Sequence, residues 1–120
     1  MAGKCDAIIV SCMDFRLQDF IYDWAIKRFG QRNHDRVAWA GAAKNVDLTL
    51  EQVGLSKKLH NISIVVLINH EECGAYGAEG TPEKQAADLK FAATKINEQN
   101  PDLTVETYYL HLDGTFKKVD

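Results

Sequence analysis

The chain has 120 residues, a formal net charge of −3, 46% hydrophobic residues and 26% charged residues. These totals predict one ordinary globular domain over residues 1–120 and exclude a disordered or fibrous chain. The acidic balance and scattered lysines and arginines argue against a nucleic-acid-binding face. Because no apolar run approaches the roughly 20 residues that span a bilayer, and the first residues turn polar too early for a signal peptide, we expect a cytoplasmic protein without membrane contact.

The first expected strand covers residues 7–10, an unbroken apolar and β-branched run that is typical of a strand buried on both faces. Apolar residues at helical spacing then predict a helix over residues 17–29, with Gly30 at the position of a C-cap. A second short strand is expected over residues 36–40, ending before Gly41. The amino-terminal third therefore predicts strand, helix and strand.

The remaining chain continues this alternation. A second helix is expected over residues 46–59, and the strongest strand signal covers residues 62–68. Thr81 and Pro82 then suit the N-cap and first position of a third helix that ends before Asn100, with Ala86, Leu89, Ala93 and Ile96 on its apolar face. A final hairpin is expected from residues 105–112 and 115–119 around Asp113-Gly114.

The order β-α-β-α-β-α-β-β predicts an α/β fold, because strands that alternate with helices form parallel sheets with right-handed crossovers. We expect an open, mostly parallel sheet with strand order 2-1-3-4. The C-terminal hairpin would add an antiparallel edge strand, and helices would flank the sheet.

Three residues with metal-binding side chains follow expected strands: Cys12 after the first, His70 and Cys73 after the third. In open α/β sheets the functional crevice lies beyond the C-terminal strand ends, so these side chains would converge. Two thiolates and an imidazole suit zinc, and three protein ligands leave one position open for catalysis. Taken singly, each residue is more often structural, as we expect for Cys5.

Asp14 and Arg16 stand two and four residues after Cys12. Arg16 can hold Asp14 in a bidentate ion pair that keeps the carboxylate ionised and aimed. Zinc with two thiolates has a formal charge near zero and acidifies a bound water less than three histidines would, so an aimed carboxylate would help to orient the nucleophile. Released from Arg16, Asp14 could instead become a fourth zinc ligand and close the site.

At these residues the sequence resembles the β-class carbonic anhydrases, whose C-x-D-x-R and H-x-x-C-G motifs match Cys12, Asp14, Arg16, His70, Cys73 and Gly74. The resemblance implies that Cys12, His70 and Cys73 bind zinc and that Asp14 and Arg16 form a catalytic dyad. It also implies a zinc-dependent lyase in which zinc-bound hydroxide attacks carbon dioxide to form bicarbonate. Gly41 and Gly74 would line the substrate pocket, and the chain would form homodimers or larger homo-oligomers.

The sequence departs from the family pattern after the second strand, where "AWAGA" stands in place of R-N-A-G-N, and the chain is short. Hydrolysis of carbonyl sulfide or carbon disulfide, and zinc binding without turnover, are therefore alternative functions. A thiol nucleophile activated by His70 is a further alternative. Glu71 and Glu72 are expected to be solvated or to support the metal ligands, and Tyr76 is expected to pack.

Overall fold

The computed structural model describes residues 2–120. Its strands, helices and short 3-10 turns are, in chain order, β1 (Ala7–Cys12), α1 (Gln18–Phe29), β2 (His34–Trp39), η1 (Ala42–Lys44), α2 (Val46–His60), β3 (Ile64–His70), η2 (Gly77–Glu79), α3 (Pro82–Gln99), β4 (Thr104–Leu110) and β5 (Phe116–Lys118).

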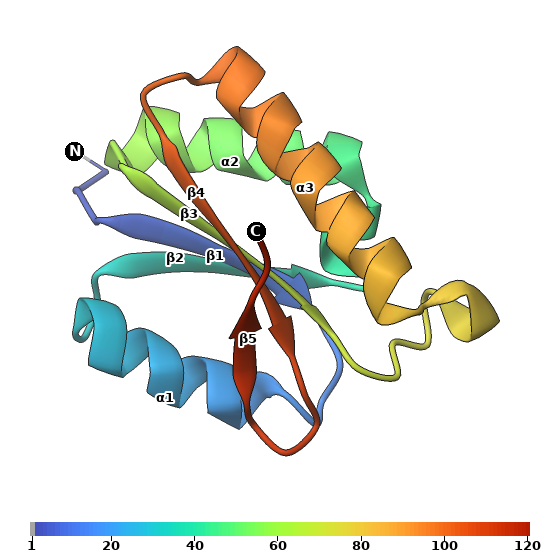
Figure 1. Cartoon of the computed structure of the whole chain (residues 1–120). Coiled ribbons are helices and arrows are strands. Elements are labelled where there is room, and N and C mark those ends of the chain that lie inside the picture. Colours follow the sequence, from blue (N-terminus) through green and yellow to red (C-terminus); the bar gives the residue numbers. More distant parts are fainter. Residues whose placement is uncertain (1) are drawn as a thin grey trace.

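These elements form a five-stranded sheet of order β2-β1-β3-β4-β5. All neighbouring strands are parallel except β5, which runs antiparallel to β4. Helix α1 covers one face, and α2 and α3 cover the other (Figure 1). The predicted α/β fold, the strand order and the antiparallel edge strand are confirmed.

Strand β1 contributes to both cores, because its side chains alternate between the two faces of the sheet. Ile8 and Val10 pack in the core beneath α2 and α3, whereas Ile9 packs in the core beneath α1. Every residue of β1 is buried. This explains why residues 7–10 are continuously apolar, as predicted for a strand covered on both faces.

The two central strands extend further than the sequence predicted. Strand β1 includes Ser11 and Cys12, and β3 includes Asn69 and His70. The apolar pattern missed these positions because their side chains are polar or titratable, yet all four are buried. As a result, Cys12 and His70 are held by the sheet itself at its C-terminal edge.

Helix α3 begins as predicted, since the Thr81 hydroxyl accepts a hydrogen bond from the Lys84 N–H and Pro82 occupies the first turn. Its buried face was predicted wrongly in part. The buried positions are Gln85, Leu89, Ala92 and Ile96, whereas Ala86 and Ala93 are only half-buried. The helix is therefore rotated so that a polar side chain, Gln85, enters the interior at its first turn.

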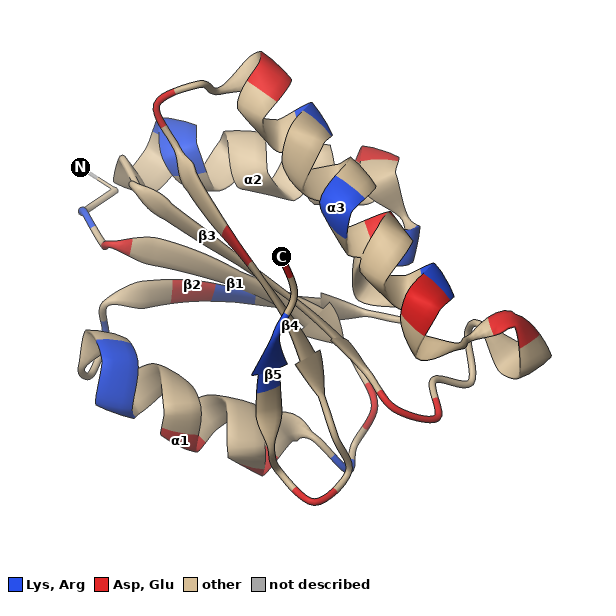
Figure 2. Cartoon of the chain, in the orientation of Figure 1, with Lys and Arg blue, Asp and Glu red and all other residues tan. Residues whose placement is uncertain are grey.

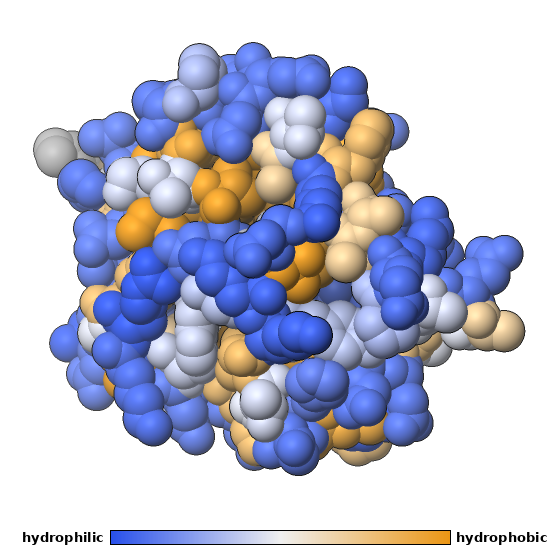
Figure 3. Space-filling model, viewed as in Figure 1, coloured by the Kyte–Doolittle hydropathy of each residue, from blue (hydrophilic) through white to orange (hydrophobic). Residues whose placement is uncertain are grey.

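The surface carries charges of both signs and some hydrophobic side chains. Acidic and basic residues are interspersed along α3 (Figure 2), and hydrophobic side chains show between α3 and the C-terminal strands (Figure 3). Among the helices within residues 2–120, none combines the length and apolar composition needed to cross a bilayer.

Candidate metal centre

Two cysteines and one histidine meet at the C-terminal edge of the sheet. Cys12 ends β1, His70 ends β3, and Cys73 lies in the loop that follows β3. The potential ligand atoms of all three lie within 4.8 Å of one another, and all three residues are buried. The structure thus brings together the three side chains that the sequence singled out as metal ligands.

The hydrogen bonding of His70 favours a metal ligand. Its Nδ1 lies 2.7 Å from the Glu71 carbonyl oxygen, and a carbonyl can only accept, so Nδ1 carries the hydrogen. In the neutral ring Nε2 then has a free lone pair, and this buried atom has no hydrogen-bond partner among residues 2–120. A backbone carbonyl that orients the ring in this way is the usual support of a metal-bound histidine.

The two thiols beside His70 are in contact, with 3.9 Å between Sγ of Cys12 and Sγ of Cys73. Burial alone would raise the pKa of Cys12, but the His70 imidazole and the Gly41 N–H outweigh it and lower this pKa to about 7. The pKa of Cys73 is raised by burial and by the neighbouring Cys12. One thiolate is therefore accessible at neutral pH, and a cation that offsets both charges would allow the second.

Gly41 approaches this group through its backbone. Its N–H points at Sγ of Cys12 over 3.4 Å, and its φ of +84° lies in the left-handed region. A Cβ at this position would lie 3.2 Å from the Cβ of Ala75, so a side chain here would be both strained and crowded. Gly74 differs: it is exposed, and an added Cβ would meet no atom within 4 Å.

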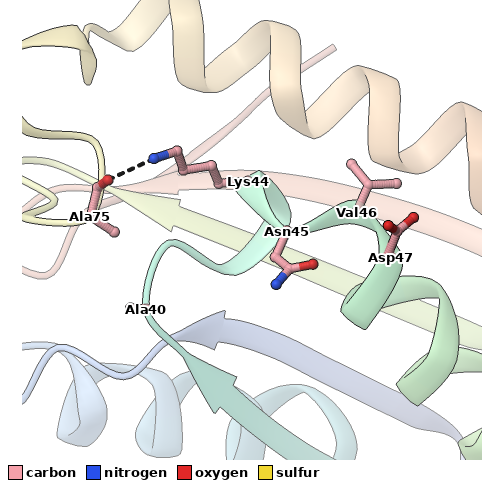
Figure 4. Close-up of a pocket in the computed structure, with 6 residues that line it drawn as sticks. All are labelled: Ala40, Lys44, Asn45, Val46, Asp47 and Ala75. Atoms are coloured by element: carbon pink, nitrogen blue, oxygen red, sulfur yellow. Dashed lines mark hydrogen bonds between the residues drawn. The ribbon is translucent and has the colours of Figure 1, made fainter.

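A surface hollow of about 530 Å³ lies between the segment after β2 and Ala75. Its lining residues are Ala40, Lys44, Asn45, Val46, Asp47 and Ala75. Lys44 closes one side, because its Nζ donates a 2.8 Å hydrogen bond to the Ala75 carbonyl (Figure 4). The cysteines and His70 do not line this hollow, but Ala40 directly precedes Gly41.

Asp14 and Arg16 form the ion pair expected for their spacing. Nε of Arg16 donates to Oδ1 of Asp14 over 3.0 Å, and Nη2 donates to Oδ2 over 2.8 Å. These hydrogen bonds lower the pKa of Asp14 to about 2, so the carboxylate stays ionised throughout the neutral range. Asp14 is not among the potential ligand atoms around His70. This is the arrangement expected when Arg16 holds the carboxylate and Asp14 does not close the site.

Arg16 also joins the two motifs. Its Nη2 donates to the Glu72 carbonyl over 3.2 Å, and its Nη1 lies 3.8 Å from the Glu72 carboxylate. Glu72 has a φ of +56°, so the loop makes its left-handed turn here rather than at Gly74. The guanidinium thus connects the loop after β1 to the loop that carries Cys73.

A polar network that no sequence pattern predicted supports the loop after β1. Nε2 of Gln18 donates to the carbonyls of Cys12 and Asp14, over 3.1 and 2.6 Å. Nη2 of Arg36 donates to Oε1 of Gln18 over 2.7 Å and to the Ser11 hydroxyl over 2.7 Å. Arg36 therefore fixes the Gln18 amide, which in turn fixes the backbone between Cys12 and Asp14.

Gln85 supports the histidine in a similar way. Its Nε2 donates to the His70 carbonyl over 2.8 Å, and its Oε1 accepts from the His70 N–H over 3.2 Å. The side chain is fully buried. At His70, β3 still pairs with β4, but its pairing with β1 ends at Ile68, so Gln85 supplies the backbone of His70 with two further hydrogen bonds. A glutamine on a helix carries no sequence signal for this role.

Replacing Gln85 by leucine should leave both backbone groups of His70 without these partners. We expect the free energy of unfolding of the metal-free protein to fall by about 1–3 kcal/mol, measured by urea denaturation. Lys90→Ala, on the exposed side of the same helix, serves as the control. A Gln85→Leu variant as stable as the wild type would contradict the supporting role.

Tyr76 does more than pack. It lies against both cysteines in a small buried cluster, as expected of a packing residue. Its hydroxyl also donates to Asp88 over 2.7 Å and accepts from Nδ2 of Asn69 over 3.1 Å. Burial and the Asp88 carboxylate raise the pKa of Tyr76, so it stays a neutral donor. It connects α3 to β3 beside the metal-ligand group.

Glu71 anchors the same loop on its other side. Its Oε1 accepts a 3.0 Å hydrogen bond from the Leu112 N–H, and its own N–H donates to the Leu110 carbonyl. Of the two acidic residues between His70 and Cys73, Glu71 is thus structural, whereas Glu72 has 70% of its side chain exposed.

Comparisons with known proteins agree with these observations. Residues 2–120 match the family model described as "Putative carbonic anhydrase". An uncharacterized protein of Rickettsia conorii is 34% identical, over 98% of this chain and 73% of the relative. One from Rickettsia bellii is 31% identical, over 98% of this chain and 83% of the relative.

Solved structures share the fold at low sequence identity. The carbonic anhydrase from Streptococcus mutans has a TM-score of 0.73 at 16% identity, covering 98% of this chain and 84% of that chain. A carbon disulfide hydrolase has a TM-score of 0.66 at 12% identity, covering 99% and 81%. Because the family model matches nearly the whole sequence, the chain belongs to this carbonic anhydrase family.

Proposed function

We propose that the protein is a zinc-dependent carbonic anhydrase that interconverts carbon dioxide and bicarbonate. The observation that carries this proposal is the buried, unpartnered Nε2 of His70, with two thiols close enough to complete a ligand group. Membership of the carbonic anhydrase family supports the choice of reaction.

Cys12, His70 and Cys73 would hold the ion. Two sulfurs and one nitrogen are a donor set that zinc favours in four-coordinate sites. Two thiolates offset the charge of the ion, which suits a buried position. When bound, zinc supplies an acidified water that acts as a nucleophile at neutral pH.

Asp14 would orient the nucleophile by accepting a hydrogen bond, because its low pKa keeps it an acceptor. Arg16 would hold this carboxylate away from the metal ligands through two parallel hydrogen bonds. The N–H of Gly41 would stabilise the Cys12 thiolate.

The test is stopped-flow hydration of carbon dioxide by protein whose zinc content has been measured. We expect hydration above the buffer rate, loss of this activity after zinc is removed by a chelator, and recovery when zinc is restored. Zinc-loaded, folded protein without any hydration would contradict the enzyme and favour a zinc-binding domain without turnover.

A second candidate reaction is hydrolysis of carbonyl sulfide or carbon disulfide. It is favoured by the exposed apolar side chains of Met13 and Phe15 in the loop that also carries Asp14, with Phe15 86% exposed. The fold is also similar to that of a carbon disulfide hydrolase. Sulfide release from carbon disulfide by the same zinc-loaded protein, without carbon dioxide hydration, would identify this activity instead.

We further propose that residues 1–120 act as one domain in the cytoplasm, where the three free cysteines stay reduced.

We also propose that the chain forms a homodimer. Strand β2 lies at the edge of the sheet, and Leu55 and Leu59 of α2 are exposed near it, beside Val37. An open edge strand with apolar neighbours suits pairing with a second copy. Sedimentation equilibrium should show a dimer, and Leu55→Lys should weaken it; a monomeric wild type would contradict this assembly.

A further inference from the structure

A second group of potential metal ligands lies at the other end of the sheet, near the N-terminal ends of β1 and β2. Cys5 stands two residues before β1, Asp35 belongs to β2, and His60 ends α2. One ligand atom from each lies within 4.8 Å of the others. Cys12 is the seventh residue after Cys5 along a mostly extended chain, so this group is roughly 20 Å from the candidate metal centre.

The hydrogen bonds of this group leave ligand atoms available. Oδ2 of Asp35 accepts from the Ser56 hydroxyl over 2.6 Å and lies 2.6 Å from Nδ1 of His60. Both contacts use the same oxygen, and Oδ1 has no hydrogen-bond partner among residues 2–120. Sγ of Cys5 donates a long hydrogen bond of 3.5 Å to the Ala7 carbonyl. The carboxylate is therefore oriented by Ser56 but not saturated.

The group can be reached from solvent. It borders a hollow of about 230 Å³, and the lining residues are Ala2, Gly3, Lys4, Cys5, Arg32, His34, Asp35 and His60. Cys5 is buried, whereas Asp35 and His60 each have 28% of their side chain exposed. A cation could thus enter from the carboxylate side and keep a water ligand while its sulfur ligand stays sheltered.

The chemistry of the donors selects the type of ion. One thiolate, one carboxylate and one imidazole are ligands of borderline-soft divalent metals such as zinc, and are unsuited to calcium or magnesium. Thiolate and carboxylate together offset the two positive charges of such an ion. Burial and the Asp35 carboxylate raise the pKa of Cys5, so the free side chain is a thiol whose proton the ion must displace.

We propose that Cys5, Asp35 and His60 form a second, structural site for a zinc-like divalent cation. The ligands are Sγ of Cys5, the carboxylate of Asp35 and Nδ1 of His60, with water as the fourth ligand. On binding, a sulfur–metal bond replaces the S–H bond of Cys5, and the thiol proton leaves to solvent. The metal also replaces the hydrogen that Nδ1 of His60 shares with Asp35, and the neutral ring takes a hydrogen on Nε2 instead, exchanged through solvent. The ion would join the segment before β1, the edge strand β2 and the end of α2. The Cys5 N–H already donates a 3.2 Å hydrogen bond to the His60 carbonyl, which holds the first of these segments to the last.

The test counts metal ions and does not depend on the proposed reaction. Purified chain is titrated with Co²⁺, a spectroscopic substitute for zinc, and bound metal is measured after gel filtration together with sulfur-to-cobalt absorption. We expect two equivalents in the wild type and one in each of Cys5→Ser and His60→Ala. Cys12→Ser/Cys73→Ser should keep one equivalent, with the absorption of a single thiolate.

Two further variants sharpen the result. Ser56→Ala keeps the three ligands but loses the support of the carboxylate, and should bind the second equivalent about 10- to 100-fold more weakly. His111→Ala, a histidine outside both groups, should still bind two. One wild-type equivalent that survives in folded Cys5→Ser and is lost from Cys12→Ser/Cys73→Ser, or two equivalents in folded Cys5→Ser, would overturn the second site. His60→Ala repeats the decision if Cys5→Ser does not fold, and a failure of carbon dioxide hydration would leave the second site untouched.

Discussion

Cys12→Ser should remove zinc from the candidate metal centre and reduce carbon dioxide hydration on the order of a thousandfold or more. The serine hydroxyl is a poor zinc ligand at neutral pH, and without the ion no water is acidified toward a pKa of about 7. Zinc content by elemental analysis and stopped-flow hydration would be measured on the same samples. His70→Ala should behave in the same way, because it removes the only nitrogen of the ligand group.

Cys5→Ser is the matched control for this experiment. It makes the same chemical change in a buried cysteine, but at the other edge of the sheet. We expect it to lose the metal of the second site and still keep the hydration rate of the wild type, because that site lies at the other end of the sheet. Hydration that survives in Cys12→Ser after the candidate metal centre has lost its ion would contradict zinc catalysis and point to a reaction of the remaining side chains.

Asp14→Asn should reduce the hydration rate about 100-fold or more while zinc remains bound, because it removes a positioned proton acceptor and leaves the ligands intact. Arg16→Gln should also be slow, since the carboxylate loses the two hydrogen bonds that aim it. If the two residues act as one unit, the double variant will be about as slow as Asp14→Asn alone. Effects that multiply in the double variant would show that they act separately.

Asp19→Asn, which removes an exposed carboxylate at the start of α1, is the control for the loss of charge in Asp14→Asn.

The stability of the fold in acid offers a second measurement of the Asp14–Arg16 ion pair. The pKa of Asp14 falls from an ordinary 3.8 to about 2, so the pair stabilises the fold above pH 4 and loses this effect as the pH falls toward 2. The difference in stability between wild type and Arg16→Gln should therefore shrink in that interval, and a difference that is independent of pH would contradict the ion pair.

Local sequence patterns predicted the arrangement of the sheet well because burial on both faces is visible in the residues themselves. The continuous apolar runs of β1 and β3, and the alternation of strands and helices, were sufficient for a mostly parallel sheet, and the expected strand order 2-1-3-4 is the one observed. They failed at the strand ends, where Ser11 and Asn69 are polar but buried, because partners such as Arg36 and the Ala43 N–H lie far away in the chain. The face of α3 was misplaced for the same reason, at Gln85.

The sequence by itself determined which residues could bind a metal and that they would meet at one edge of the sheet, because parallel strands bring their C-terminal ends together. It also determined the Asp14–Arg16 pair, whose partners are two residues apart. Only the tertiary structure decided which polar side chains support them, as Gln18, Arg36 and Gln85 do. It alone brought Cys5, Asp35 and His60 together, because contacts between distant segments depend on how the helices pack on the sheet and leave no local periodicity to detect.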